Sequence, residues 1–249
     1  MRIEQFLSDS AQRLGPVPAI VAAGRSHSYR DLGRGAERVA VALGSRGVRL
    51  GDHVAVVMDN NYAAVVTTFG VLMAGGVVCA IDPRTGADEL QNALKNSHAV
   101  ALATEARFAS ATAAALATTT SIRLVLLSGG DRSTASASCL CFEDLIAGIG
   151  PGPGVPRAGT ASDPAIVLGT AGAETVTLTH ADIVAAASAT SHAGPASGLR
   201  SILSHHGLCQ LLAAIRAGAT IVLESSPLFS HGVFSREADG AEATPALAG

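Results

Sequence analysis

The residues of this sequence that are best suited to chemistry lie in a short loop near position 170. Gly169-Thr170-Ala171-Gly172 separates two expected strands, residues 165–168 and 175–178. Glycine and threonine in unusual backbone conformations can direct several N–H groups toward one point, which is what the binding of a phosphate group requires. The loop therefore predicts a small nest of backbone donors.

The charge beside this loop opposes phosphate binding. Glu174 lies just after the nest, and no lysine occurs between Lys95 and the C-terminus. Two like charges about 4 Å apart repel by roughly 1 to 4 kcal/mol, so a carboxylate in place of a cation weakens the attraction for a polyphosphate. The same residues also fit a plain β-hairpin with Ala-Gly at its turn, followed by a helix. In that interpretation Thr179 caps the helix and His180 forms a hydrogen bond with nearby backbone.

A second group of polar side chains lies further along the chain. His205, His206 and Cys209 fall within one short segment, and imidazole next to thiol can serve as a nucleophile or a metal site. A partly exposed loop without a catalytic role fits the segment as well. Cys139-Leu140-Cys141 is a C-x-C pair, which alone is a weak indication of metal binding. We therefore assign no metal ligand and no catalytic residue.

Composition indicates a globular protein of a reducing compartment. The 249 residues are 48% hydrophobic and 15% charged, which is enough for a well-buried core. The net charge is −3, aromatic residues make up 3% and there is no Trp, so the basic surface of a nucleic-acid-binding protein is missing. The four cysteines form no C-x-x-C pair, and we expect a cytoplasmic location.

One segment approaches the length of a membrane span. Residues 63–81 run for nineteen positions without a charge, interrupted by two threonines and Gly75-Gly76. Parallel strands that are covered on both faces read as continuous apolar runs. We therefore expect a buried helix that leads into a buried strand, and no membrane span.

The expected helices and strands alternate along the chain, which predicts an α/β fold with a mostly parallel sheet flanked by helices. Gly, Ser and Pro dominate residues 129–161, which we interpret as a linker between a first α/β subdomain at 1–128 and a partial second one at 162–225. Residues 226–249 are expected to form a flexible tail. The expected strands are residues 18–22, 53–58, 77–81, 99–103, 122–127, 165–168, 175–178, 199–203 and 219–224.

Short motifs occur in a fixed order along the rest of the sequence. They are Ser28-Tyr29-Arg30-Asp31-Leu32, Gly51-Asp52, Asn60, Phe69-Gly70, Ala74-Gly75, Asp82-Pro83 and residues 208–223. Together with the loop, they resemble the adenylate-forming ligases, which are the acyl-CoA and aryl-acid synthetases and the adenylation domains. The resemblance covers about residues 1 to 224.

The loop departs from the pattern of that family, which is roughly Y-T-S-G-T-T-G-x-P-K-G-V-x-L-T-H. Here the loop is about one residue shorter, lacks the proline and has Glu174 where the family has lysine. The resemblance implies a degenerate phosphate loop whose matching residues are Gly169, Thr170, Gly172, Thr179 and His180.

The resemblance also implies a fold like the N-terminal domain of these ligases, with a pocket for an acyl or aryl carboxylate. His205, His206 and Gly207 lie near the family's His-x-x-Gly element and are the candidates for that pocket. Members of the family usually run to about twice this length, and their magnesium- and ribose-binding acids and their catalytic lysine follow later. We therefore expect a truncated, non-catalytic relative that serves as a scaffold or binding partner, either as a homodimer or with a protein partner.

Two alternatives remain open. In the first, the chain is one half of a split ligase that forms acyl-adenylates from ATP and Mg²⁺ together with a second chain. In the second, a repurposed active site uses His205, His206 or Cys209 for a reaction of another class.

Overall fold

The computed structural model describes residues 1–130, 138–148, 159–169, 175–190 and 201–223. Its α-helices are α1 (Ile3–Leu14), α2 (Tyr29–Ser45), α3 (Tyr62–Met73), α4 (Ala87–Asn96), α5 (Ala109–Leu116), α6 (Phe142–Ala147), α7 (His180–Ala189) and α8 (His205–Ala217). Its strands are β1 (Pro18–Ala22), β2 (Arg25–Ser28), β3 (His53–Val57), β4 (Val77–Ala80), β5 (Ala101–Glu105), β6 (Leu124–Ser128), β7 (Cys139–Cys141), β8 (Pro164–Leu168), β9 (Val176–Thr179) and β10 (Ile221–Leu223).

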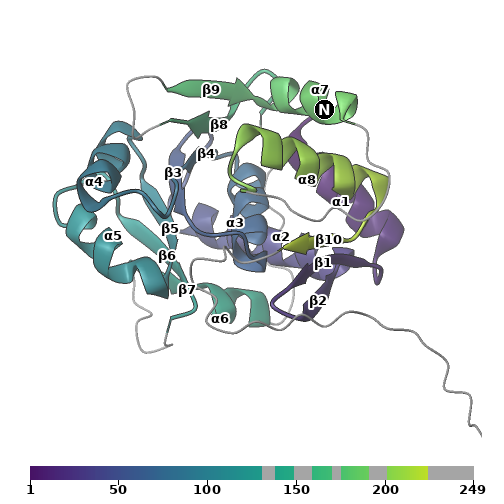
Figure 1. The fold of residues 1–249 in the computed structure, drawn as a ribbon, viewed down its shortest axis with the longest axis horizontal. Helices are drawn as coiled ribbons and strands as arrows, with labels where there is room; N and C mark the ends of the chain where they lie inside the picture. The colour runs from purple at the N-terminus through teal and green to yellow at the C-terminus, as the bar shows by residue number, and fades with distance from the viewer. Residues whose placement is uncertain (131–137, 149–158, 170–174, 191–200, 224–249) are drawn as a thin grey trace, which may run out of the picture.

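Seven of these strands form one sheet in the order β7-β6-β5-β3-β4-β8-β9. All neighbouring pairs are parallel except β8 and β9, which form an antiparallel hairpin. Parallel strands end at the same edge of a sheet, so the loops that follow β3, β4, β5 and β8 gather at one edge (Figure 1). This arrangement confirms the predicted α/β fold with a mostly parallel sheet flanked by helices.

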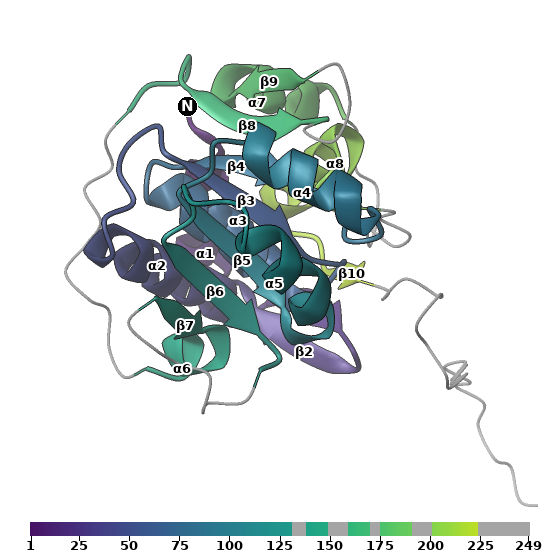
Figure 2. The ribbon, with the colours of Figure 1, turned by 90° about the vertical axis from the view of Figure 1, so that its left-hand side faces the viewer.

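Both faces of this sheet are covered by helices, as Figure 2 shows. Val54 and Val56 of β3 belong to a core cluster with Phe69 of α3, whereas Ala55 and Val57 belong to a second cluster with Leu94 of α4. Successive side chains of a strand point to opposite faces, so each strand serves both clusters. This explains why the inner strands are apolar at every position rather than at alternate positions.

A second, smaller sheet connects the end of the described chain to its beginning. Its order is β10-β1-β2, with β10 parallel to β1 and Ile20 opposite Ile221. The Tyr29 hydroxyl donates a hydrogen bond of 2.8 Å to the Ala219 carbonyl, and the Ser10 hydroxyl donates one of 2.9 Å to the Ile215 carbonyl. Helices α1 and α8 therefore lie together beside this sheet (Figure 1).

Some local expectations differ from the structure. Strands β2 and β7 were not expected, and β7 falls within the segment 129–161 that the sequence marks as a linker. The prediction of a strand at 199–203 is wrong for the described residues 201–203, which form a turn. The turn forms because the Ser204 hydroxyl and N–H both donate to the Ser201 carbonyl before α8 begins. Residues 226–249, the expected tail, lie outside the described residues, and the boundaries of the subdomains stay a prediction.

The apolar run at residues 63–81 forms a buried helix and a buried strand, as expected. It is divided into α3 and β4, and every residue of α3 after Tyr62 is buried. Gly75 ends the helical part with a φ of 82°, a conformation that glycine adopts at little cost. In the described part of the chain, no helix is both long and apolar enough to cross a membrane.

Helices α2 and α3 approach each other closely where they cross at Gly70. A Cβ atom added to Gly70 would lie 2.5 Å from Cγ1 of Val39 and 3.1 Å from the carbonyl oxygen of Ala36. Both distances are shorter than van der Waals contact, so the crossing requires glycine at this position.

We therefore expect Gly70→Ala to lower the free energy of unfolding by about 1 to 3 kcal/mol, the usual cost of overpacking a core. Gly44→Ala is the matched control in α2, because nothing lies within 4 Å of a Cβ atom added there. This control should leave stability unchanged or raise it by up to about 1 kcal/mol, since alanine favours a helix. Urea unfolding measures both effects, and a Gly70→Ala variant as stable as the control would contradict the packing argument.

Candidate functional site

A hollow of about 360 Å³ lies at the carboxyl ends of β4 and β8. Binding sites for small molecules have volumes of roughly 300 to 1,000 Å³, and open α/β sheets bind ligands at the carboxyl ends of their strands. We call this hollow the strand-end pocket. It is lined by residues 80–85, Gly169, Ser201, Leu203 and Ser204.

Gly169 is the one residue of the predicted phosphate loop that the structure places in this pocket. It follows β8 directly and has a φ of 78°, which favours glycine. Thr170 and Gly172, together with Glu174, lie outside the described residues. The backbone therefore leaves the sheet at the edge of the pocket, in a conformation that suits the start of a nest.

An ion pair forms one side of the pocket. The Arg84 guanidinium binds Asp82 in a bidentate manner, with Nε 2.9 Å from Oδ1 and NH2 2.7 Å from Oδ2. These hydrogen bonds hold the pKa of Asp82 below its usual value. Both side chains are about half exposed, at 54% and 49%, so the pair faces solvent at the pocket rim.

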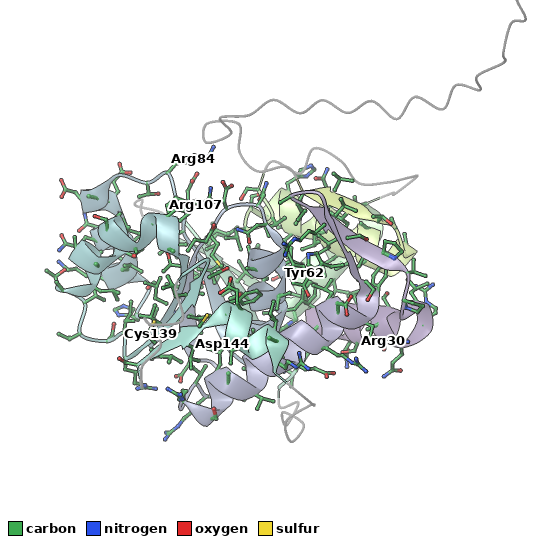
Figure 3. All side chains as sticks on the ribbon, turned by 90° about the horizontal axis from the view of Figure 1, so that it is seen from below. Arg30, Tyr62, Arg84, Arg107, Cys139 and Asp144 are labelled. Atoms are coloured by element: carbon green, nitrogen blue, oxygen red, sulfur yellow. The ribbon has the colours of Figure 1, made fainter. Side chains whose placement is uncertain are left out.

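A second group of charges lies at the ends of the neighbouring strands β3 and β5. Arg107 contacts Glu105 at 2.9 Å and Asp59 at 3.2 Å. Figure 3 shows Arg84 and Arg107 along the same edge of the sheet. Acidic and basic side chains therefore alternate where the parallel strands end, and most of their charge is matched within the group.

Another wall of the pocket is the turn at residues 201–204. Ser204 caps α8 by accepting a hydrogen bond of 3.1 Å from the Gly207 N–H. Asn60, in the turn after β3, accepts a hydrogen bond of 2.9 Å from the Ile202 N–H. This contact joins the wall to the carboxyl end of a core strand.

Thr179 and His180 have the structural roles that the hairpin interpretation predicts. Thr179 caps α7 in a capping box with Asp182. His180 is 1% exposed, and its Nδ1 accepts a hydrogen bond of 3.2 Å from the Ile3 N–H. Neither residue lines the strand-end pocket, and any contact of theirs with a phosphate stays a prediction.

His180 belongs to a buried polar cluster that joins α7 to the N-terminus. Arg2 and Glu4 form an ion pair of 2.8 Å, and Glu4 lies 3.6 Å from His180 Nδ1. The pKa of His180 is lowered to about 4, first by burial and then by the positive charge of Arg2, and the carboxylate of Asp163 opposes this shift in part. Because Nδ1 accepts from Ile3, the neutral ring carries its proton on Nε2, which has no hydrogen-bond partner among the described residues.

The structure separates the side chains of the second polar group. His205 and His206 are exposed in the first turn of α8, whereas Cys209 is buried. Burial raises the pKa of Cys209 above that of a free thiol, which disfavours the reactive thiolate. Gly207 packs against the Ser201 backbone, and the pocket is lined by Ser201, Leu203 and Ser204 rather than by the two histidines.

The C-x-C pair lies on the edge strand β7, away from the strand-end pocket. Cys139 is labelled in Figure 3, and the thiol of Cys141 donates to Glu143 at 3.3 Å. In the residues that the structure describes, no three side chains of the types that bind metals are grouped as a metal site would require.

Several pocket residues were not singled out by the sequence. Arg84, Thr85, Ser201 and Ser204 carry polar groups into the lining. Asp82-Pro83 directly after a buried strand marks the correct edge, and a serine before a helical pattern predicts an N-cap at Ser204. Nothing in the sequence brings these two segments together, because their contact depends on packing between distant parts of the chain, such as the hydrogen bond from Ile202 to Asn60.

Comparison with known proteins identifies relatives of this chain. The family model described as AMP-binding enzyme matches residues 7–238. Phosphinothricin tripeptide synthetase PhsC from Streptomyces viridochromogenes is 39% identical over 99 residues, which cover 40% of this chain and 9% of PhsC. The chain therefore matches a small part of this much longer relative.

Solved structures share the fold. MbtA from Mycobacterium smegmatis superimposes with a TM-score of 0.77 at 28% identity, covering 91% of this chain and 44% of MbtA. A benzoate CoA ligase from Burkholderia xenovorans LB400 superimposes with a TM-score of 0.78 at 20% identity, covering 91% of this chain and 46% of that ligase. The second likeness concerns the fold alone, and the chain spans less than half the length of both proteins.

The lowered pKa of His180 predicts that acid destabilises the fold. The unfolded histidine, with its ordinary pKa of 6.5, binds more protons than the folded one down to a pH of about 4. The contribution of His180 to the free energy of unfolding should therefore rise by up to about 3 kcal/mol between pH 4 and 6.5. Above pH 6.5 this contribution should stay constant. His180→Gln should remove this part of the slope in urea unfolding at pH 4.5 to 7, whereas His205→Gln, at an exposed position, should keep it. Equal slopes in the two variants would contradict the assignment.

Proposed function

The chain belongs to the AMP-binding enzyme family, and from this premise we propose that it is a non-catalytic scaffold or binding partner in acyl or aryl acid activation. Its proposed ligand is a carboxylic acid in the strand-end pocket. The apolar lining of Ala80, Ile81 and Leu203 suits an acyl chain or aryl ring, and the hydroxyl group of Ser201 suits its carboxylate.

The distribution of cations supports the non-catalytic part of this proposal. Adenylate formation brings a carboxylate up to the α-phosphate of ATP and needs positive groups to neutralise the developing charge. Lys95 is the only lysine of the 249 residues, and it lies exposed on α4 rather than in the pocket lining. Arg84 is the one cation among the described lining residues, and it is already engaged by Asp82. Glu174 adds a negative charge to the loop.

A split ligase is the alternative that the fold favours. This chain shares the fold of MbtA over 91% of its own length and covers 44% of MbtA. In this alternative, a second chain supplies lysine and the ligands of Mg²⁺. In that case ATP and Mg²⁺ are the cofactors, and the loop that begins at Gly169 has to bind nucleotide before the second chain acts.

Nucleotide titration distinguishes the non-catalytic scaffold from the split ligase. We expect the wild-type chain to give no heat with Mg·ATP in calorimetry and no pyrophosphate exchange with a panel of aryl and acyl carboxylates. Glu174→Lys should produce measurable binding of Mg·ATP, since it replaces repulsion by attraction. Glu37→Lys, on the exposed face of α2, makes the same change in net charge and should bind no nucleotide.

Binding of Mg·ATP by the wild-type chain would favour the split ligase. Pyrophosphate exchange by the wild-type chain alone would refute the non-catalytic proposal. If the two lysine variants behave alike, the argument from the charge of Glu174 is wrong.

We further propose that the chain works as a homodimer or with a protein partner, in the cytoplasm. Strand β9 is the last strand of the large sheet, and Val176 on it is 51% exposed. An edge strand with an exposed apolar residue offers unpaired backbone groups to another chain. The four cysteines are all free, which supports a reducing compartment.

Light scattering coupled to size exclusion tests the assembly. We expect a mass above that of one chain at tens of micromolar, or a stable complex with a co-purified protein. Val176→Lys should reduce the association, whereas Leu50→Lys, at a residue that is 53% exposed outside β9, should not. A clean monomer of the wild-type chain that also purifies alone would contradict the proposal.

A further inference from the structure

One side chain joins the wall of the strand-end pocket to the end of a core strand. Asn60 is 7% exposed, and its Oδ1 accepts the hydrogen bond from Ile202 N–H across 142 positions of the sequence. Ile202 lies between Ser201 and Leu203, both of which line the pocket. Asn60 therefore holds this wall at its centre.

The wall is a compact unit, so one contact can set its position. The Ser204 hydroxyl donates to the Ser201 carbonyl at 2.8 Å and accepts from Gly207 N–H at 3.1 Å. These bonds connect the turn to the first residues of α8. Ile202 is 1% exposed, and a buried backbone N–H that loses its acceptor is costly.

The position of Asn60 is in turn set by charges at the ends of β3 and β5. The Asn60 N–H donates to Asp59 Oδ1 at 2.8 Å, and the Asp59 N–H donates to Glu105 Oε1 at 2.6 Å. Arg107 bridges the two carboxylates, at 3.2 Å from Asp59 and 2.9 Å from Glu105. Hydrogen bonds to charged groups are about twice as strong as neutral ones, so these charges fix the turn that carries Asn60.

We propose that Asn60 is the positioning residue of the strand-end pocket, and that Arg107 acts on the pocket wall through it. The ligand part rests on the proposed function, since the pocket is taken to bind a carboxylic acid. The positioning part rests on the contacts alone. Without Asn60 the wall loses its anchor to β3, and the pocket loses its defined width.

Hydrogen exchange of the Ile202 amide in the full chain tests the positioning part, with the amides of Val56 and Leu102 as reporters of global opening. Loss of a hydrogen bond of ordinary strength corresponds to about a tenfold change in a local equilibrium. Asn60→Ala should therefore accelerate exchange at Ile202 by about tenfold relative to the two core amides. Asn61→Ala is the matched control, because Asn61 caps α3 by accepting from Ala64 N–H and has no hydrogen bond to the wall.

Arg107→Gln is a second variant, which keeps the core intact because Arg107 is 36% exposed. It should accelerate exchange at Ile202 by a smaller factor, and it should add nothing in a double variant with Asn60→Ala. Arg84→Gln is its control, since Arg84 pairs with Asp82 at the pocket rim, and it should leave exchange at Ile202 unchanged.

Equal exchange at Ile202 in Asn60→Ala and Asn61→Ala would overturn the proposal, as would an acceleration at Ile202 that the two core amides match. If Asn60→Ala does not fold, the outcome with Arg107→Gln decides. Additive effects of Arg107→Gln and Asn60→Ala would overturn the route from Arg107 through Asn60.

Calorimetry with benzoate and octanoate tests the ligand part. If either acid binds the wild-type chain, Asn60→Ala should weaken it by about tenfold, whereas Asn61→Ala should not. If neither acid binds, the proposed pocket ligand fails, and the exchange data still decide whether Asn60 positions the wall.

Discussion

The structure depends on a parallel sheet whose inner strands are buried on both faces. Apolar side chains occupy every position of β3 from Val54 onward, and helices cover them on each side. Such strands have no room for polar groups along their length, so polar side chains concentrate where the strands end. Because the strands are parallel, these ends share one edge, and the pocket with its charged neighbours lies there.

At that edge the charged side chains form ion pairs with one another. Arg84 is paired with Asp82, and Arg107 with Asp59 and Glu105. Such pairs fix the loops that carry them, but they leave little positive charge for an anionic ligand. With no lysine in the pocket lining and Glu174 in the loop, the electrostatics suit a carboxylic acid better than a triphosphate, which needs several cations. The proposed separation of ligand binding from adenylate formation follows from this balance.

Much of the fold follows from the sequence because periodic apolar patterns act locally. The division of residues 63–81 into a helix and a strand, the Thr179 cap of α7, and the parallel sheet were all expected. The errors concern segments whose conformation depends on hydrogen bonds to other parts of the chain. Strand β2 is short, consists of four polar residues and pairs with β1. The turn at residues 201–203 replaces an expected strand because Ser204 and Asn60 take its backbone hydrogen bonds.

For the site, the sequence by itself determined which residue types are present. It identified Gly169 at the end of a strand, the acidic loop, and a chain with a single lysine, because these are properties of composition and order. Only the tertiary structure decided which residues meet. The pairing of β4 with β8 brings Asp82 and Arg84 to Gly169, and Asn60 reaches Ile202 across 142 positions. It also buried His180 against Arg2. No local pattern encodes contacts at such separations, since they arise from the order of the strands in the sheet.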